Sequence, residues 1–108
     1  MGLTKTEEFT KTQNDLAIMA KALGHPARIA ILQFLIKQKS CVCGDIVDQL
    51  PLSQSTVSQH LNELKKAGII KGDIDGPTVC YCIDEKQWNK IKLALGNLFE
   101  SYKGQTCC

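Results

Sequence analysis

Apolar residues recur at three- and four-residue steps in two stretches near the start of the chain, over residues 4–23 and about 26–38. This spacing predicts two amphipathic helices. Gly24 suits the end of the first, and Pro26 suits the start of the second, because a first-turn residue does not need its N–H. We expect the second helix to be the most buried, since it carries Ile29, Ile31, Leu32, Phe34, Leu35 and Ile36.

Two more helices are predicted in the middle of the chain. A short one fits residues 43–50 and ends at Pro51, because the residue before a proline disfavours helical geometry. Ser53 is a natural N-cap for the next, which runs to Ala67 and is followed by Gly68. The apolar residues of this longer helix, at steps of four and three, are Val57, Leu61 and Leu64.

The period of the pattern then changes from helical to alternating. Residues 69–74 and 78–83 read as two strands joined by the turn-forming residues 75–77. In the second strand Val79, Tyr81 and Ile83 share one face, and Cys80 and Cys82 share the other. A final helix over 84–102, capped by Asp84, carries its apolar residues at Trp88, Ile91, Leu95, Leu98 and Tyr102.

This order of elements predicts a fold of the α+β class that is mostly α. The two middle helices form a helix-turn-helix, and the two-stranded hairpin after them forms a wing. The whole is a winged helix-turn-helix with a C-terminal helix. We expect one DNA-binding and dimerisation domain over residues 4–103 and a flexible, cysteine-containing tail over 104–108.

Composition narrows the class of protein. With 108 residues, 44% of them hydrophobic, the chain has room for one domain, and its net charge of +2 is weak evidence for a nucleic-acid partner. It has no apolar run of about 18 residues and no signal-peptide pattern, so we expect a cytoplasmic protein without a membrane partner. Thiols stay reduced there, which favours six reactive or metal-binding cysteines over a disulfide framework. No catalytic Cys–His pair or phosphate loop is recognisable, so we expect no enzyme.

The outward face of the helix over 53–67 is polar in an unusual way. It is rich in Ser, Thr, Gln and Asn, with Glu63 as its one acid, whereas an ordinary exposed helix carries more Glu and Lys pairs. Such side chains hydrogen-bond to bases, and lysines follow the phosphates. His60 is the least certain member, because a lone helix histidine is commonly a packing residue. The predicted DNA contacts are Gln54, Ser55, Thr56, Ser58, Gln59, His60, Asn62, Lys65, Lys66 and Lys71.

Cys41 and Cys43 flank Val42 at the start of the predicted short helix. Free N–H groups and the helix dipole in a first turn favour thiolate, and thiolates are ligands for soft ions. A third thiolate would complete such a site. The third stays open between the tail, Cys107 and Cys108, and the strand cysteines, Cys80 and Cys82.

Several motifs in order resemble the ArsR/SmtB family of metal-responsive repressors. They are residues 22–32 (ALGHPARIAIL), 41–43 (CVC), 53–61 (SQSTVSQHL), Leu64 with 67–70 (AGII), and 79–81 (VCY). The resemblance covers about residues 16–83. It implies a winged-helix homodimer paired through its first and last helices, which represses transcription in the ligand-free state from an inverted-repeat operator in double-stranded DNA.

The resemblance also bears on the effector and the wing. Cys-Val-Cys at this place matches the inducer site of arsenic, antimony, cadmium or lead sensors. The last helix has no histidine, so the zinc site of some members is absent. We therefore expect arsenite or antimonite as effector, with cadmium, lead or zinc as alternatives, bound by Cys41 and Cys43 with Cys107 or Cys108 from the tail. Many wings of the family carry Arg near the turn; this one offers Lys71, Asp73 and Asp75, so we expect no tight insertion into DNA.

Two hypotheses of other classes stay open. In the first, the cysteines form a redox switch in which disulfide formation releases DNA. Cys41 and Cys43 would close a strained ring with each other, so pairing with the tail is the easier route. In the second, the chain is a cytosolic thiol-rich metal buffer that binds no DNA, against which the polar helix face argues.

Overall fold

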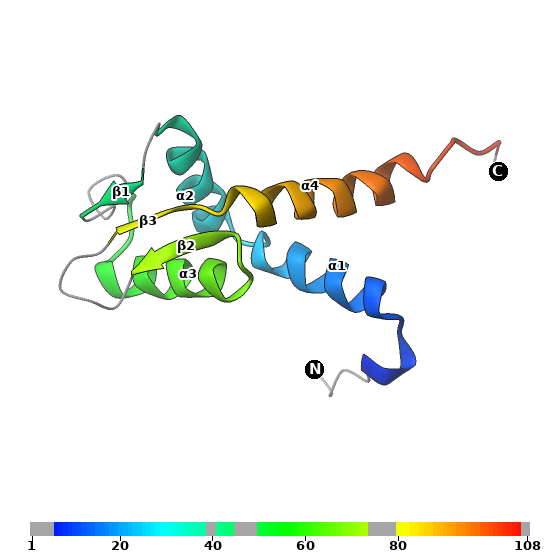
Figure 1. Cartoon of the computed structure of the whole chain (residues 1–108), viewed down its shortest axis with the longest axis horizontal. Helices are drawn as coiled ribbons and strands as arrows, with labels where there is room; N and C mark the ends of the chain where they lie inside the picture. Colours follow the sequence, from blue (N-terminus) through cyan, green and yellow to red (C-terminus); the bar gives the residue numbers. More distant parts are fainter. Residues whose placement is uncertain (1–5, 39–40, 45–49, 74–79, 107–108) are drawn as a thin grey trace.

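Four α-helices and a small antiparallel sheet make up the part of the chain that the computed structural model describes, residues 6–38, 41–44, 50–73 and 80–106 (Figure 1). The elements, in order, are η1 (Thr6–Glu8), α1 (Lys11–Ala22), α2 (Pro26–Lys37), β1 (Val42–Cys43), α3 (Gln54–Lys66), β2 (Ile70–Asp73), β3 (Cys80–Ile83) and α4 (Glu85–Glu100). The predicted fold class, mostly helical with a hairpin before the last helix, is confirmed.

Side-chain caps determine where the helices begin. The side chains of Ser53 and Asp84 accept the Thr56 and Gln87 N–H groups at 3.4 and 3.2 Å, so α3 and α4 start where the sequence predicts. The first helix was predicted to begin at residue 4, which is wrong: α1 begins at Lys11, behind a separate 3-10 turn. Thr10 and Gln13 form a capping box there. A reciprocal cap of this kind fixes where a helix begins, whatever apolar pattern lies before it.

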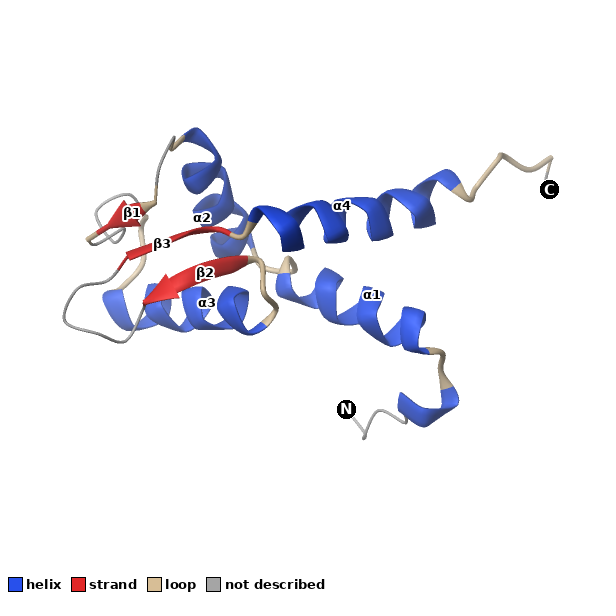
Figure 2. Ribbon diagram, in the orientation of Figure 1, coloured by secondary structure: helices blue, strands red, loops and turns tan. Residues whose placement is uncertain are grey.

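The sheet has the strand order β1-β3-β2, with both pairings antiparallel (Figure 2). The predicted hairpin is confirmed as β2 and β3, but β1 was not expected. The predicted helix over 43–50 is wrong at its start, because Cys43 lies in β1; residues 45–49 lie outside the described part of the chain. Gly72 has a φ of +133°, and a Cβ there would collide with the Cys80 carbonyl, so β2 approaches β3 closely because it has glycine at this point.

The core lies between α2, α3, the sheet and the start of α4. Its most deeply buried side chains are Ile31, Leu64, Ile69, Ile70, Val57 and Tyr81. The prediction that α2 is the most buried helix is too strong. Ile29 and Ile36 are 41% and 56% exposed, and α3 buries four residues, as α2 does.

The helices α1 and α4 extend side by side away from this core (Figure 1). Ile91 is buried, and Trp88 and Leu95 pack against the core. Beyond them α4 exposes Leu98 at 51% and Phe99 at 71%. The outer half of the α1–α4 pair therefore presents apolar side chains to solvent. None of the helices in the described ranges is both long and apolar enough to cross a bilayer.

Candidate nucleic-acid interface and cysteine cluster

The outward face of α3 presents most of the residues predicted to contact DNA. Exposed side chains are Gln54, Ser55, Gln59, Lys65 and Lys66, with Lys71 exposed at the start of the wing. Thr56, Ser58 and Asn62 are half-buried. Thr56 also lies 3.0 Å from Ser53 through their hydroxyl oxygens, and so belongs to the N-cap of the helix. Lys66 forms an ion pair with Glu63, at 3.7 Å, on the surface of the last turn.

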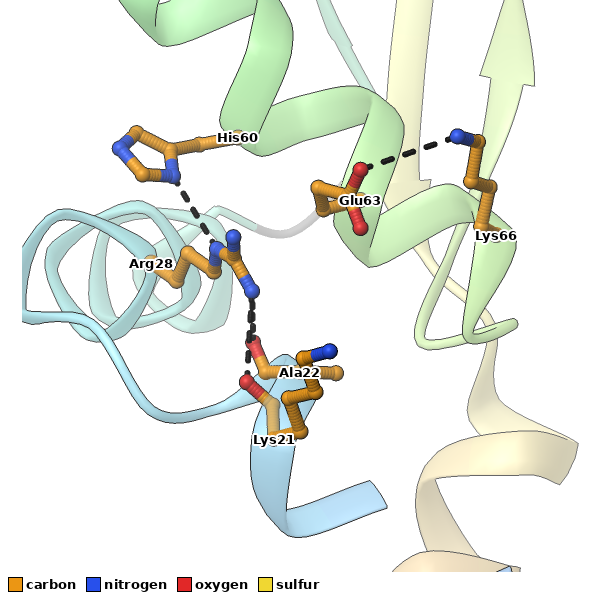
Figure 3. Close-up of polar contacts among 6 residues, drawn as sticks. All are labelled: Lys21, Ala22, Arg28, His60, Glu63 and Lys66. Atoms are coloured by element: carbon orange, nitrogen blue, oxygen red, sulfur yellow. Dashed lines mark hydrogen bonds and ion pairs between the residues drawn. The ribbon is translucent and has the colours of Figure 1, made fainter. Parts of the chain in front are cut away.

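His60 lies on the opposite side of α3 from this face. It is 7% exposed, and its Nδ1 accepts a hydrogen bond from the Arg28 Nε at 3.0 Å (Figure 3). The ring of His25, which caps α2 by accepting the Ala27 N–H, lies 4.3 Å from the His60 ring between centroids. The structure gives His60 a packing position, and its contact with DNA stays a prediction.

Arg28 joins three helices. Besides the bond to His60 on α3, its Nη1 donates to the carbonyls of Lys21 and Ala22 at 3.3 and 3.4 Å (Figure 3). Those carbonyls belong to the last turn of α1, where a cation is stabilised by the helix dipole. A single side chain of α2 thus fixes the end of α1 and the middle of α3.

The surroundings of His60 keep its imidazole neutral. Burial lowers the pKa of His60 below 6.5, and the nearby His25 and Arg28 lower it further, against a smaller upward effect of Glu63. A protonated imidazole also has no lone pair on Nδ1 to accept from Arg28. The neutral form is therefore the one compatible with the three-helix junction.

The cysteines at β1 and on the central strand β3 form a cluster. Cys43 stands directly opposite Cys80 in the β1–β3 register, and the two are joined by a disulfide with a Cα–Cα distance of 4.0 Å. Two residues along the strands, Cys41 is joined to Cys82, with a Cα–Cα distance of 4.5 Å. Opposed residues in an antiparallel pair come about this close when they are not hydrogen-bonded to each other. Two links, one just before β1 and one at its last residue, therefore tie β1 to β3.

This cluster corrects several expectations. Cys43 lies in β1 and Cys41 directly precedes it, so neither lies in the helix first turn that the sequence predicts. The expected reduced thiols are bonded in pairs, because the register sets each beside a partner. Among the described residues no three His, Cys, Asp or Glu side chains are arranged to hold a metal ion. Cys107 and Cys108 lie outside the described residues, so their proposed part in a metal site stays a prediction.

Two features of the site were not predicted from the sequence. Arg28 is the single arginine of the chain, and nothing in its local pattern indicates three partners. The pairing of Cys41 and Cys43 with Cys82 and Cys80 had a visible signal. Two Cys-x-Cys segments, laid antiparallel, place four sulfurs on one face, but that required recognising residues 42–43 as a strand.

The comparison with protein families finds one matching model, described as "Bacterial regulatory protein, arsR family", over residues 25–71. A helix-turn-helix transcriptional regulator of Methanocaldococcus jannaschii is 45% identical over 75 residues, 68% of this chain and 83% of that protein. The helix-turn-helix transcriptional repressor SmtB of Mycobacterium tuberculosis is 43% identical over 63 residues, 58% of this chain and 46% of that protein.

Solved structures agree with these sequence matches. An ArsR-like transcriptional regulator from Rhodococcus sp. RHA1 superposes with a TM-score of 0.67 at 24% identity, covering 85% of this chain and 86% of that one. At this sequence identity the similarity shows a shared fold alone. The matched residues 25–71 run from the cap of α2 through α3 to β2 and so include the polar face of α3.

The buried His60 predicts a pH-dependent stability. Its folded-state pKa lies below 6.5, so the unfolded chain takes up the proton first, and the free energy of unfolding falls as the pH drops below about 6.5. His60→Gln, which keeps an acceptor but does not titrate, should flatten this fall between pH 7 and 5. Urea unfolding at each pH measures it. His25→Asn, which keeps the cap of α2, is the matched control and should retain most of the slope. A His60→Gln variant with the wild-type slope would contradict the assignment.

Proposed function

The chain belongs to the ArsR family of bacterial regulatory proteins, and we propose that it is a homodimeric, cytoplasmic repressor that leaves its operator when its cysteines bind a thiophilic effector. Family membership makes it a DNA-binding transcriptional regulator with a helix-turn-helix fold. The expectation that it is no enzyme is thereby confirmed. Repression, dimerisation and the effector are the parts of this proposal that go beyond membership.

The observation that carries the DNA-binding part is the exposed, nearly acid-free N-terminal half of α3. Gln54, Ser55 and Gln59 are exposed there, while Val57 and Leu61 anchor the other side of the helix in the core. A helix held in this way offers its amide and hydroxyl groups to a major groove, and Lys65 and Lys66 continue toward the phosphates. The name of the mycobacterial relative, a transcriptional repressor, favours repression over activation.

The exposed apolar side of α4 supports the dimer. Leu98 and Phe99 are too exposed to serve the core of a single chain, and α1 lies beside α4 with Ile18 58% exposed. Two copies that join these faces would set two α3 helices in one symmetric molecule. Recognition helices about 34 Å apart fit successive major grooves, which makes an inverted repeat the expected operator.

The effector proposed first is trivalent arsenic or antimony, with cadmium, lead or zinc as alternatives. Its support is the convergence of Cys41, Cys43, Cys80 and Cys82 on one face of the sheet, which supplies three or more sulfurs once the disulfides are reduced. β1 precedes α3 and β2 follows it, so a ligand that pulls β1 and β3 together acts on both ends of the recognition helix. Switching from mostly bound to mostly free requires about 5.5 kcal/mol of differential binding.

A redox switch is the second candidate, and the two disulfides favour it specifically. Oxidation by a peroxide would convert two thiols and H2O2 into one disulfide and two waters, with the two electrons passing from sulfur to the peroxide oxygens. The partners are then Cys80 and Cys82 rather than the tail cysteines. In this version DNA affinity follows the oxidation state without any metal.

Gln59→Ala should weaken operator binding by about 1–3 kcal/mol, the value of one good base contact. The measurement is fluorescence anisotropy at fixed salt, with DNA that the wild-type protein has selected from random sequence. Gln33→Ala is the matched control, because Gln33 is an exposed glutamine of α2 away from the proposed face. Equal operator affinity of the two variants would mean that the surface that contacts the bases is not on α3.

Leu98→Glu should convert the dimer to a monomer, because it places a charge in the proposed seam at a cost of several kcal/mol. Leu98 is half-exposed, so the fold of a single chain should tolerate the change, unlike one at core-packed Leu95. Sedimentation velocity measures the outcome. Asn97→Glu, one residue earlier on an exposed position of α4, serves as control. A Leu98→Glu variant that sediments as a dimer refutes this interface.

A Cys41→Ser, Cys43→Ser double variant should bind operator DNA and stay bound in arsenite, because a protonated hydroxyl is a poor ligand for a soft ion. Anisotropy of the reduced protein, titrated with arsenite, antimonite, cadmium and zinc, measures release. Deleting Cys107 and Cys108 should leave the response unchanged if β3 supplies the third sulfur. Normal release from the double variant would disprove the site, and release by peroxide alone would favour the redox candidate.

A further inference from the structure

A hollow of about 600 Å³ opens beside one of the two cysteine pairs. Cys41 and Cys82 line it, whereas neither Cys43 nor Cys80 is among its lining residues in the described part of the chain. Ligand pockets for small molecules span about 300–1,000 Å³, so this space has the size of a binding site. The two cysteine pairs are both cross-strand pairs of β1 and β3, but only Cys41 and Cys82 lie beside the hollow.

The walls of this hollow are largely apolar. Leu35 and Ile36 come from the end of α2, Ile83 from β3 and Trp88 from the start of α4. Ile36 is 56% exposed although it is a large aliphatic side chain beside the hollow. An apolar group held next to the two sulfurs would cover such a surface and gain the corresponding burial free energy.

A lysine lies beside the same pair. Lys71 is the ladder partner of Cys82 in β2, and it lines the hollow as well. Directly opposed residues of an antiparallel pair have Cβ atoms about 4.5–5.5 Å apart. A neighbouring ammonium favours the thiolate form, which is the reactive one. Cys41 is exposed, so the pair is open to a ligand that arrives through the hollow.

We propose that Cys41 and Cys82, with the hollow beside them, bind an organic trivalent arsenical that carries one aryl group. An arsenic atom with one carbon substituent has two bonds left for sulfur, which matches a pair of cysteines, whereas inorganic arsenite requires three. The aryl group would lie against Ile36 and Trp88. This inference deepens the proposed function, since it names the class of effector and the pair that binds it.

The binding step involves no change in the oxidation state of arsenic. Two monothiol molecules, or one phosphine with one water, first reduce the Cys41–Cys82 disulfide to two thiols; the monothiols become a disulfide, and the phosphine becomes its oxide. The arsenoxide R–As=O and the two thiols then form R–As(S–Cys)2 and one water: two S–H bonds break, two As–S bonds form, and the oxygen leaves with both protons.

Phenylarsine oxide is the test ligand, and Trp88, the single tryptophan, is the reporter. The full chain is reduced with a phosphine, freed of it and titrated. We expect quenching of Trp88 and one phenylarsenic adduct by intact mass. The Cys43→Ser, Cys80→Ser variant should keep both, and the matched Cys41→Ser, Cys82→Ser variant should lose both. Quenching of equal strength in the two variants would overturn the proposal.

A substitution in the wall of the hollow distinguishes the contact with the aryl group from the binding of arsenic by the two sulfurs. Ile36→Glu should weaken phenylarsine oxide binding about tenfold or more, and leave arsenite binding within about twofold, because arsenite has no group to bury. Circular dichroism shows whether the variant folds, and Gln38→Glu, at another residue of the rim, is the charge-matched control. Equal loss for both arsenicals means that the hollow does not hold the aryl group, which also overturns the proposal.

DNA anisotropy in the same titrations separates this inference from the proposed function. If phenylarsine oxide binds Cys41 and Cys82 selectively but neither arsenical releases DNA, the binding site stands and the effector-controlled repressor fails. If arsenite releases DNA while phenylarsine oxide shows no preference between the two pairs, the repressor stands and the aryl site fails.

Discussion

The pairing of Val42 with Tyr81 across β1 and β3 is the contact on which the arrangement of the cysteines depends. Tyr81 is almost fully buried and Val42 packs against the core, so the register is held by apolar burial. Because side chains alternate along a strand, the neighbours of these two residues must lie on the other face. Those neighbours are the four cysteines, and a slip by one residue would bury sulfur and expose Tyr81.

A second junction, built on Arg28, fixes the positions of α1 and α3 relative to α2. Its guanidinium bonds to the last turn of α1 and to His60 in the middle of α3. α1 belongs to the proposed dimer face, and α3 to the proposed DNA face. The distance between two recognition helices in a dimer therefore depends on the contact between a buried, neutral imidazole and one half-buried arginine.

The sheet and the helices also explain how chemistry at the cysteines can reach the DNA face. β1 precedes α3 in the chain and β2 follows it directly, while β3 lies between the two strands and leads into α4. A bond formed between β1 and β3 constrains the frame in which α3 sits. The hollow beside Cys41 and Cys82 extends this coupling to Trp88, at the root of the helix that we assign to dimerisation.

The sequence by itself determined the positions of α2, α3 and α4, the hairpin, the polar face of α3 and the family. Each depends on local patterns: the 3.6-residue period, the Ser53 and Asp84 caps, and the alternation in β3. Only the tertiary structure decided that Val42–Cys43 is a strand, that Cys41 and Cys43 face Cys82 and Cys80, and that His60 is buried against Arg28. These are contacts between segments 32 to 41 residues apart. A two-residue strand has too short a pattern to be recognised in the sequence. It forms because one edge of β3 is free to pair with it and because Val42 packs against the core.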